Sequence, residues 1–224
     1  MRMGNGALPK QYLMLGGKPI LIHTIEKFLV HERIDVILVL VPADWAAFTE
    51  EIIAEHQLTG KEIIVVVGGE TRNDTLMKGV EYIEQTYGVG DNDIIVTHEG
   101  VRPFVTARII DENIAGAVED GAVNTAVSAN NTMLISFDGA YISNMPDRNH
   151  MFIGQTPQSA NLKLLRTCYD SLTDEQIDSL TEMCRIFVYT GAKVRLVMGE
   201  YSNIKMTTPE DFELAKAIIG QRQS

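Results

Sequence analysis

The sequence predicts an α/β protein with a Rossmann-like, three-layer arrangement around a mostly parallel sheet. Two patterns predict it: continuous apolar runs recur along the chain, and segments with apolar residues at helical spacing separate them. Composition agrees, because 45% hydrophobic and 22% charged residues in a chain of 224 are typical of a globular protein. With no repeat or linker in view, we expect a single domain over residues 1–224.

The elements follow in order along the chain. Apolar runs at 36–41 (VILVLV), 63–67 (IIVVV) and 94–96 (IIV) predict strands buried on both faces. Apolar stripes at helical spacing predict helices that include 21–29, 48–53, 76–87 and 109–118. Further along, the pattern predicts a helix at 162–172 and a strand at 194–198. A last helix includes 212–219, with Thr208 as N-cap, Pro209 at the first position and Asp211 three residues after the cap.

The segment 130–155 departs from this alternation. Short apolar pieces flank Asp138-Gly139, a dipeptide that favours a hairpin turn. We therefore expect a β-hairpin or arm inserted in the α/β body. Such an arm is suited to contacts between two copies of the chain, so we predict that 130–155 is a dimerisation arm.

The charge balance limits the partners. The net charge is −11, which argues against nucleic acid, and no apolar run approaches the roughly 20 residues of a membrane span. The two cysteines, Cys168 and Cys184, lack a metal-type spacing, so we expect a cytoplasmic protein without a disulfide framework. A small phosphorylated ligand remains compatible, because six cations fall in loop-like motifs: Arg2, Lys10, Arg72, Arg102, Arg148 and Lys205.

Ligands of open parallel sheets bind beyond the carboxyl ends of the strands, and polar loops follow the predicted strands there. Gly68-Gly69 begins one loop, where it allows close backbone approach to a ligand or makes a simple turn. Glu99 and Arg102 in the next loop either hold a metal and a phosphate or pair with each other. Lys205 and Thr207 lie two apart on an extended segment, as a phosphate clamp requires, although a solvated lysine is the commoner explanation of any one such pair.

Taken together, these motifs resemble the bacterial cytidylyltransferases that make CDP-alditols, namely the 2-C-methyl-D-erythritol 4-phosphate and ribitol-5-phosphate cytidylyltransferases. The resemblance covers essentially the whole chain. It is carried by Arg2-Met3-Gly4, Pro9-Lys10-Gln11, Gly68-Gly69 with Arg72, Val101-Arg102-Pro103, Asp147-Arg148, Gln155-Thr156-Pro157-Gln158 and Asn203-Ile204-Lys205 with Thr207. Segments 154–158 and 199–203 look closer to the ribitol phosphate branch, which we favour.

The resemblance implies transfer of a cytidylyl group from CTP to an alditol phosphate with release of pyrophosphate, assisted by Mg²⁺ at Glu99. It implies that Arg2 and Lys10 are catalytic and that the arm pairs two subunits in a homodimer. CTP would bind at Gly68, Gly69, Glu70, Arg72, Thr75 and Gly100. The alditol phosphate would bind at Thr132, Arg148, Lys205 and Thr207.

The chain also departs from the family pattern. Glu99 and Glu182 stand where the family usually has Asp, and Asn131 stands where Asp normally precedes Thr132. A first apolar strand and Gly-rich loop, roughly a dozen residues, are absent ahead of Arg2, which predicts an unpaired gap in the sheet. Either the start is truncated or misassigned, or the chain is a natural variant.

Three functions remain open at this point. We predict formation of CDP-ribitol from CTP and D-ribitol 5-phosphate, for teichoic-acid-like or other wall polymers. A second interpretation is the 2-C-methyl-D-erythritol 4-phosphate enzyme of isoprenoid biosynthesis. A third is a catalytically impaired nucleotide-binding paralogue, which the altered acids and the missing loop would favour.

Overall fold

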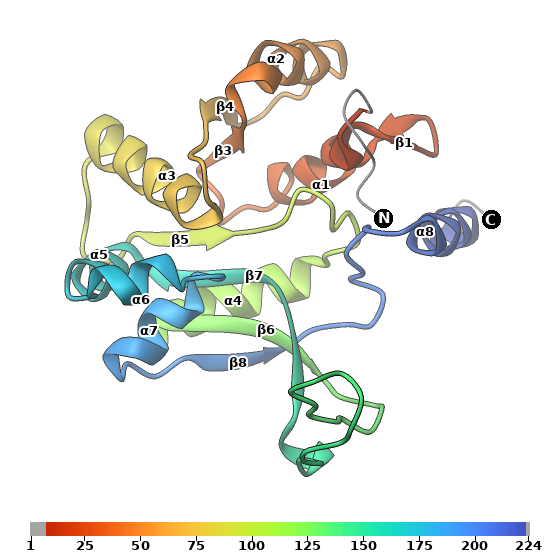
Figure 1. Cartoon of the computed structure of the whole chain (residues 1–224). Helices are drawn as coiled ribbons and strands as arrows, with labels where there is room; N and C mark the ends of the chain where they lie inside the picture. The colour runs from red at the N-terminus through yellow and green to blue at the C-terminus, as the bar shows by residue number, and fades with distance from the viewer. Residues whose placement is uncertain (1–7, 223–224) are drawn as a thin grey trace.

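Six of the strands form one parallel pair and one four-stranded sheet in this computed structural model, which describes residues 8–222 (Figure 1). The strands are β1 (Met14–Leu15), β2 (Lys18–Pro19), β3 (Val36–Val41), β4 (Glu62–Val67), β5 (Ile94–Thr97), β6 (Ala122–Ser128), β7 (Phe152–Asn161) and β8 (Arg195–Met198). The α-helices are α1 (Ile20–Leu29), α2 (Ala46–Glu55), α3 (Arg72–Tyr87), α4 (Ala107–Asp120), α5 (Leu162–Asp170), α6 (Asp174–Asp178), α7 (Cys184–Thr190) and α8 (Pro209–Arg222). Short 3-10 helices are η1 (Lys10–Tyr12), η2 (Ala43–Trp45) and η3 (Arg148–His150).

The α/β class is confirmed, and the predicted strands and helices occur in the predicted order, whereas β6, β7, α6 and α7 lie between them without having been predicted. The three apolar runs form β3, β4 and β5, and β3 pairs with β4 in parallel. The predicted start of the last helix is also correct, because Thr208 N–H donates to the Asp211 carboxylate (2.8 Å) and Asp211 N–H donates to the Thr208 hydroxyl (3.3 Å). Most residues of β3 and β4 are half-buried, however, and not fully buried as their apolar runs predict.

The four-stranded sheet, in the order β5-β7-β6-β8, is mixed. Strands β6 and β8 pair in parallel, whereas β7 runs antiparallel to both of its neighbours. The sequence gives no apolar signal for β7, because buried polar residues such as Gln155, Gln158 and Ser159 occupy it. The last four residues of the predicted arm, 152–155, are part of this strand.

The predicted gap in the sheet is present within residues 8–222. Strand β3 pairs with β4 alone, and β5 pairs with β7 alone, so an unpaired edge of each sheet remains. Side chains connect the two sheets instead, because Ile37 of β3 and Val96 of β5 pack on one buried cluster that includes Phe28 and Ile109.

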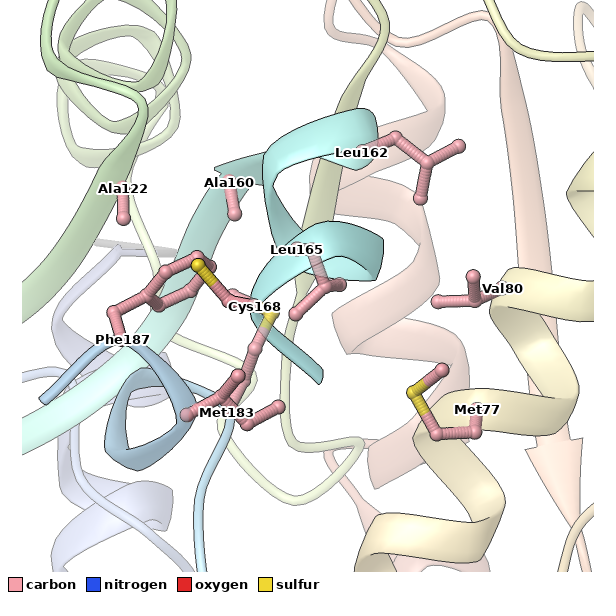
Figure 2. Close-up of a cluster of buried hydrophobic side chains, with 10 residues drawn as sticks. Met77, Val80, Ala122, Ala160, Leu162, Leu165, Cys168, Met183 and Phe187 are labelled. Carbon is pink, nitrogen blue, oxygen red and sulfur yellow. The ribbon is translucent and has the colours of Figure 1, made fainter. Parts of the chain in front are cut away.

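Helices cover both faces of the four-stranded sheet and so complete three layers. On one face, Ala122 of β6 and Ala160 of β7 pack with α3, α5 and α7 (Figure 2). On the other face, Val123 of β6 packs with Ala117 of α4. None of the helices within residues 8–222 combines the length and apolarity that a membrane crossing requires.

The arm lies between β6 and β7, apart from the sheets (Figure 1), and is closed at its base by a hydrogen bond from Ala129 N–H to the carbonyl of Met151 (2.9 Å). The predicted turn is present: Gly139 has φ of +73°, and the Asp138 carboxylate accepts the N–H groups of Ala140 and Tyr141. These bonds lower the pKa of Asp138. Of the two alternatives, a hairpin or an arm, the structure has an arm without regular strands, because an isolated bridge between Ile135 and Asn144 is the only strand pairing described within 130–151.

Candidate active site

The carboxylate of Glu99 lies at the centre of the candidate site, just beyond the carboxyl end of β5. Its Oε2 accepts a hydrogen bond from Nε of Arg102 (2.7 Å). Its Oε1 pairs with Nζ of Lys205 (2.6 Å) and with a terminal guanidinium nitrogen of Arg72 (3.2 Å). Arg72 comes from the start of α3 and Lys205 from the loop after β8. The predicted convergence of strand-end cations is therefore present for these three.

Glu99 is ionised at neutral pH. Its side chain is only 13% exposed, and burial by itself would raise the carboxyl pKa. The hydrogen bonds and positive charges of Lys205 and Arg102 outweigh burial and lower the pKa to about 2. The neighbouring His98 is neutral, because burial lowers its pKa to about 4. With one carboxylate against three cations, the local charge favours anions.

Arg102 and Asn203 fix the loop after β8 against the loop after β5. Arg102 is buried, and its NH1 donates to the carbonyl of Asn203 (2.8 Å). The Asn203 amide is fully buried and donates to the carbonyl of Thr156 (2.9 Å). The Thr156 hydroxyl in turn accepts Glu99 N–H (3.2 Å), so β7 supports both loops. This network sets the position of Lys205, two residues after Asn203.

The Gly68-Gly69 loop precedes Arg72 and leads into α3. Gly69 N–H donates to the hydroxyl of Thr75 (3.0 Å), and Thr71 and Asp74 form a reciprocal capping box at the start of α3. A Cβ on Gly69 would lie 2.2 Å from Cβ of Asp74, so only glycine fits this turn. Thr75 is thus a structural part of the loop, and Glu70 lies exposed within it.

At the C-terminal side of the site, Lys10 and Thr207 are brought together, because Nζ of Lys10 donates to the carbonyl of Thr207. The Thr207 hydroxyl donates to the carboxylate of Asp211 (3.0 Å), as part of the α8 cap. Thr207 therefore does not share the ion pair of Lys205. Gly100, which follows Glu99, contacts α1, because its carbonyl accepts a hydrogen bond from the hydroxyl of Thr24 (3.1 Å).

Two alditol-phosphate candidates lie away from this group. Thr132 and Arg148 belong to the arm, and Arg148 hydrogen-bonds the carbonyl of Asn130 (3.4 Å). The hydrogen bonds of the described residues do not join either one to Glu99. Arg2 lies outside the described residues.

Three contributors to the site were assigned no role from the sequence. Lys78, in the second turn of α3, donates to the carbonyl of Gly68 (2.9 Å). Asn203 and Thr156 are buried polar residues that hold the loops together. Their motifs, Gln155-Thr156-Pro157-Gln158 and Asn203-Ile204-Lys205, carried the resemblance, and this is the signal that identifies them.

One ionised carboxylate fits a magnesium ion that takes its other ligands from phosphate oxygens and water. Glu99 supplies such a carboxylate, and the two side chains on its Oε1 are 42% and 52% exposed, so they can move away. Among residues 8–222, no three His, Cys, Asp or Glu side chains gather as a metal-binding group. Glu99 is therefore the residue that would hold such an ion.

Gly69→Ala is expected to lower the free energy of unfolding by about 1–3 kcal/mol, because the new methyl group overlaps Asp74 and disrupts the capping box. Urea denaturation measures the change. Gly220→Ala is the matched control, since its Cβ meets no atom within 4 Å and alanine favours a helix. Equal stability of the two variants would contradict the tight turn.

The lowered pKa of Glu99 predicts acid sensitivity. A carboxyl whose pKa is about 2 in the folded protein, below the 4.5 of an unperturbed glutamate, stabilises the fold above pH 4.5. That contribution, at most about 3 kcal/mol, is lost as the pH falls from 4.5 towards 2. Unfolding free energies measured across this range should fall more steeply for the wild type than for Glu99→Gln. Parallel pH profiles would contradict the prediction.

Comparisons with known proteins identify the family of the chain. The sequence model of the 2-C-methyl-D-erythritol 4-phosphate cytidylyltransferase family matches residues 1–221. A ribitol-5-phosphate cytidylyltransferase of Lactiplantibacillus plantarum is 48% identical over 221 residues, which is 99% of this chain and 94% of that protein.

Solved structures confirm the fold. The 4-diphosphocytidyl-2C-methyl-D-erythritol synthase of Anaerococcus prevotii superposes with a TM-score of 0.81 at 28% identity, covering 97% of this chain and 92% of that one. The 2-C-methyl-D-erythritol 4-phosphate cytidylyltransferase of Francisella tularensis gives 0.80 at 26% identity, covering 96% and 94%. The chain therefore belongs to the 2-C-methyl-D-erythritol 4-phosphate cytidylyltransferase family, a family of nucleotidyltransferases.

Proposed function

We propose that this protein forms CDP-ribitol and pyrophosphate from CTP and D-ribitol 5-phosphate. The 48% identity to a ribitol-5-phosphate cytidylyltransferase over 99% of the chain carries the choice of alditol. The cations around Glu99, at the ends of several strands, support the chemistry, because both substrates are polyanions.

In the proposed reaction, an oxygen of the alditol phosphate attacks the α-phosphorus of CTP. A new P–O bond forms, the bond to the bridging oxygen breaks, and pyrophosphate leaves with that electron pair. Lys10 and Arg2 would stabilise the charge at the phosphorus, while Arg72 and the Gly68-Gly69 loop bind the nucleotide. Lys205 would hold the alditol phosphate. Bound at Glu99, Mg²⁺ would supply further neutralisation of the triphosphate.

The test is pyrophosphate release by the full chain with CTP, Mg²⁺ and ribitol 5-phosphate. The expected result is steady release that requires all three components and is slower with UTP. The family match also supports 2-C-methyl-D-erythritol 4-phosphate as the acceptor, and a higher kcat/KM for that alditol would favour this second function. Calorimetric binding of CTP without any turnover would instead identify a catalytically impaired paralogue.

We propose further that the predicted arm, without its last four residues that belong to β7 (130–151), joins two copies of the chain and carries Thr132 and Arg148 to the neighbour's site. Large apolar side chains on the arm support this, because Phe137 is 90% exposed and Tyr141 is 77% exposed. A monomer leaves such side chains in water, whereas a second copy would cover them.

A double variant, Phe137→Ser with Tyr141→Ser, is expected to shift the protein from dimer to monomer in sedimentation velocity. The KM for the alditol phosphate should then rise at least tenfold, as it should in Arg148→Ala, because the phosphate loses a charge-assisted partner. Val188→Ser is the matched control, since Val188 is 67% exposed on α7, outside the arm. An unchanged dimer in the double variant would overturn the proposed interface.

A further inference from the structure

A single oxygen atom, Oε1 of Glu99, holds one cation from each of the two proposed substrate subsites. Lys205 Nζ lies 2.6 Å from this oxygen, and the Arg72 guanidinium lies 3.2 Å from it. Arg102 is separate, because it pairs with the other oxygen, Oε2. Arg72 and Lys205, the two side chains proposed to bind substrate phosphates, are thus already paired with one oxygen of the protein's own carboxylate.

The three partners differ in their freedom to move. The side chains of Arg72 and Lys205 are 52% and 42% exposed, whereas that of Glu99 is 13% exposed. Arg102 is 10% exposed and is fixed to Asn203 as well. An incoming phosphate can therefore draw Arg72 and Lys205 away, while Glu99 and Arg102 stay in place.

This exchange has an electrostatic cost for a phosphate that arrives without a metal ion. Such a phosphate takes the two cations and leaves Oε1 of Glu99 poorly solvated, unpaired and close to another anion. A phosphate that carries a divalent cation avoids this cost, because the cation neutralises the released oxygen. Glu99 therefore opposes the binding of a metal-free phosphate and does not oppose the binding of a phosphate that carries a divalent cation.

We propose that Glu99 is a specificity-determining residue that makes the site select metal-bearing polyphosphates over the same polyphosphates without metal. The inference rests on the proposed function, since it takes Arg72 and Lys205 as the groups that bind substrate phosphates. It goes beyond that function because it assigns Glu99 a role in substrate binding, in which its carboxylate competes with the substrate phosphates for Arg72 and Lys205.

The test is equilibrium binding of pyrophosphate, measured by titration calorimetry on the full chain with Mg²⁺ or with EDTA. The wild type is expected to bind pyrophosphate at least tenfold more tightly with Mg²⁺. In Glu99→Gln, metal-free affinity should rise about tenfold and the effect of Mg²⁺ should fall below threefold. Metal-free binding that is no tighter in Glu99→Gln than in the wild type would overturn the proposal.

Glu200→Gln is the matched control, because Glu200 pairs with Arg108 (3.0 Å) in the same loop as Lys205 but contacts neither Arg72 nor Lys205. It removes the same charge, so an equal gain in metal-free affinity would show a general charge effect and overturn the proposal. If Glu99→Gln does not fold, Glu99→Asp replaces it. The shorter side chain withdraws from Lys205 Nζ, and metal-free affinity should rise about threefold; no gain would overturn the proposal.

The outcomes separate this inference from the proposed function. If the wild type forms CDP-ribitol but Glu99→Gln gains no metal-free affinity, the selectivity role alone is wrong. If neither form binds pyrophosphate and the wild type does not turn over CTP, both are wrong.

Discussion

Lys10→Ala is expected to lower kcat for CDP-alditol formation by about 10²–10³-fold, with KM for either substrate changing less than about threefold. Lys10 Nζ donates to the carbonyl of Thr207, which places its charge beside the loop that also carries Lys205. A group that binds the charge developing at phosphorus acts mainly in the transition state, so its loss reduces turnover more than ground-state binding. Steady-state kinetics with each substrate varied in turn measure both constants.

Lys18→Ala is the matched control for Lys10→Ala. Lys18 lies eight residues further along and pairs with Glu26 (2.6 Å), outside the Glu99 group. Its loss should change kcat less than twofold. A rise in KM with unchanged kcat for Lys10→Ala would contradict the transition-state role and would place Lys10 in substrate binding.

Arg102→Met is expected to cause the largest loss of stability among the site variants, about 3 kcal/mol in the free energy of unfolding. The change removes the buried guanidinium that pairs with Oε2 of Glu99 (2.7 Å) and anchors the carbonyl of Asn203 (2.8 Å). A buried carboxylate then keeps only its two half-exposed partners. Urea denaturation at neutral pH measures the loss.

Arg108→Met is the control that tests whether the burial of Arg102 causes the large loss of stability expected for Arg102→Met. Arg108 is 44% exposed and pairs with Glu112 and Glu200, so its loss should cost less than about 1 kcal/mol. The double variant Glu99→Gln with Arg102→Met should recover part of the stability, because no unpaired carboxylate remains. A cost for Arg102→Met equal to that for Arg108→Met would contradict the buried network.

Local signals predicted much of the fold. The runs that form β3, β4 and β5 are apolar throughout, and the Thr208 cap is a short-range motif. Strand β7 was not predicted, because its polar residues are stabilised by partners far away in the sequence. Gln158, for example, is 2% exposed and donates hydrogen bonds to Asn124 and Glu182. Such pairing leaves no apolar periodicity in the sequence.

The site was predicted as a set of strand-end loops, but its central contact was not. The spacing of Glu99 and Arg102 allowed a pair three residues apart, and the structure contains it. Lys205 is 106 positions from Glu99, and only the folded sheet shows that both use one carboxylate. The resemblance implied that Glu99 binds a metal and that Lys205 binds a phosphate, whereas in the structure the two side chains form an ion pair.

The arm shows the same limit. Asp138-Gly139 predicted its turn, which depends on neighbouring residues. Regular strands did not form around that turn, because the exposed side chains of Phe137 and Tyr141 have no second layer within one chain to pack against.

The most direct test of the proposed activity is a competition in one vessel. The full chain receives CTP and Mg²⁺ with equal concentrations of ribitol 5-phosphate and 2-C-methyl-D-erythritol 4-phosphate, and mass spectrometry quantifies the products. The expected result is CDP-ribitol in clear excess, with pyrophosphate in equal molar amount to the total CDP-alditol. Excess CDP-methylerythritol, or neither product, would contradict the proposed function.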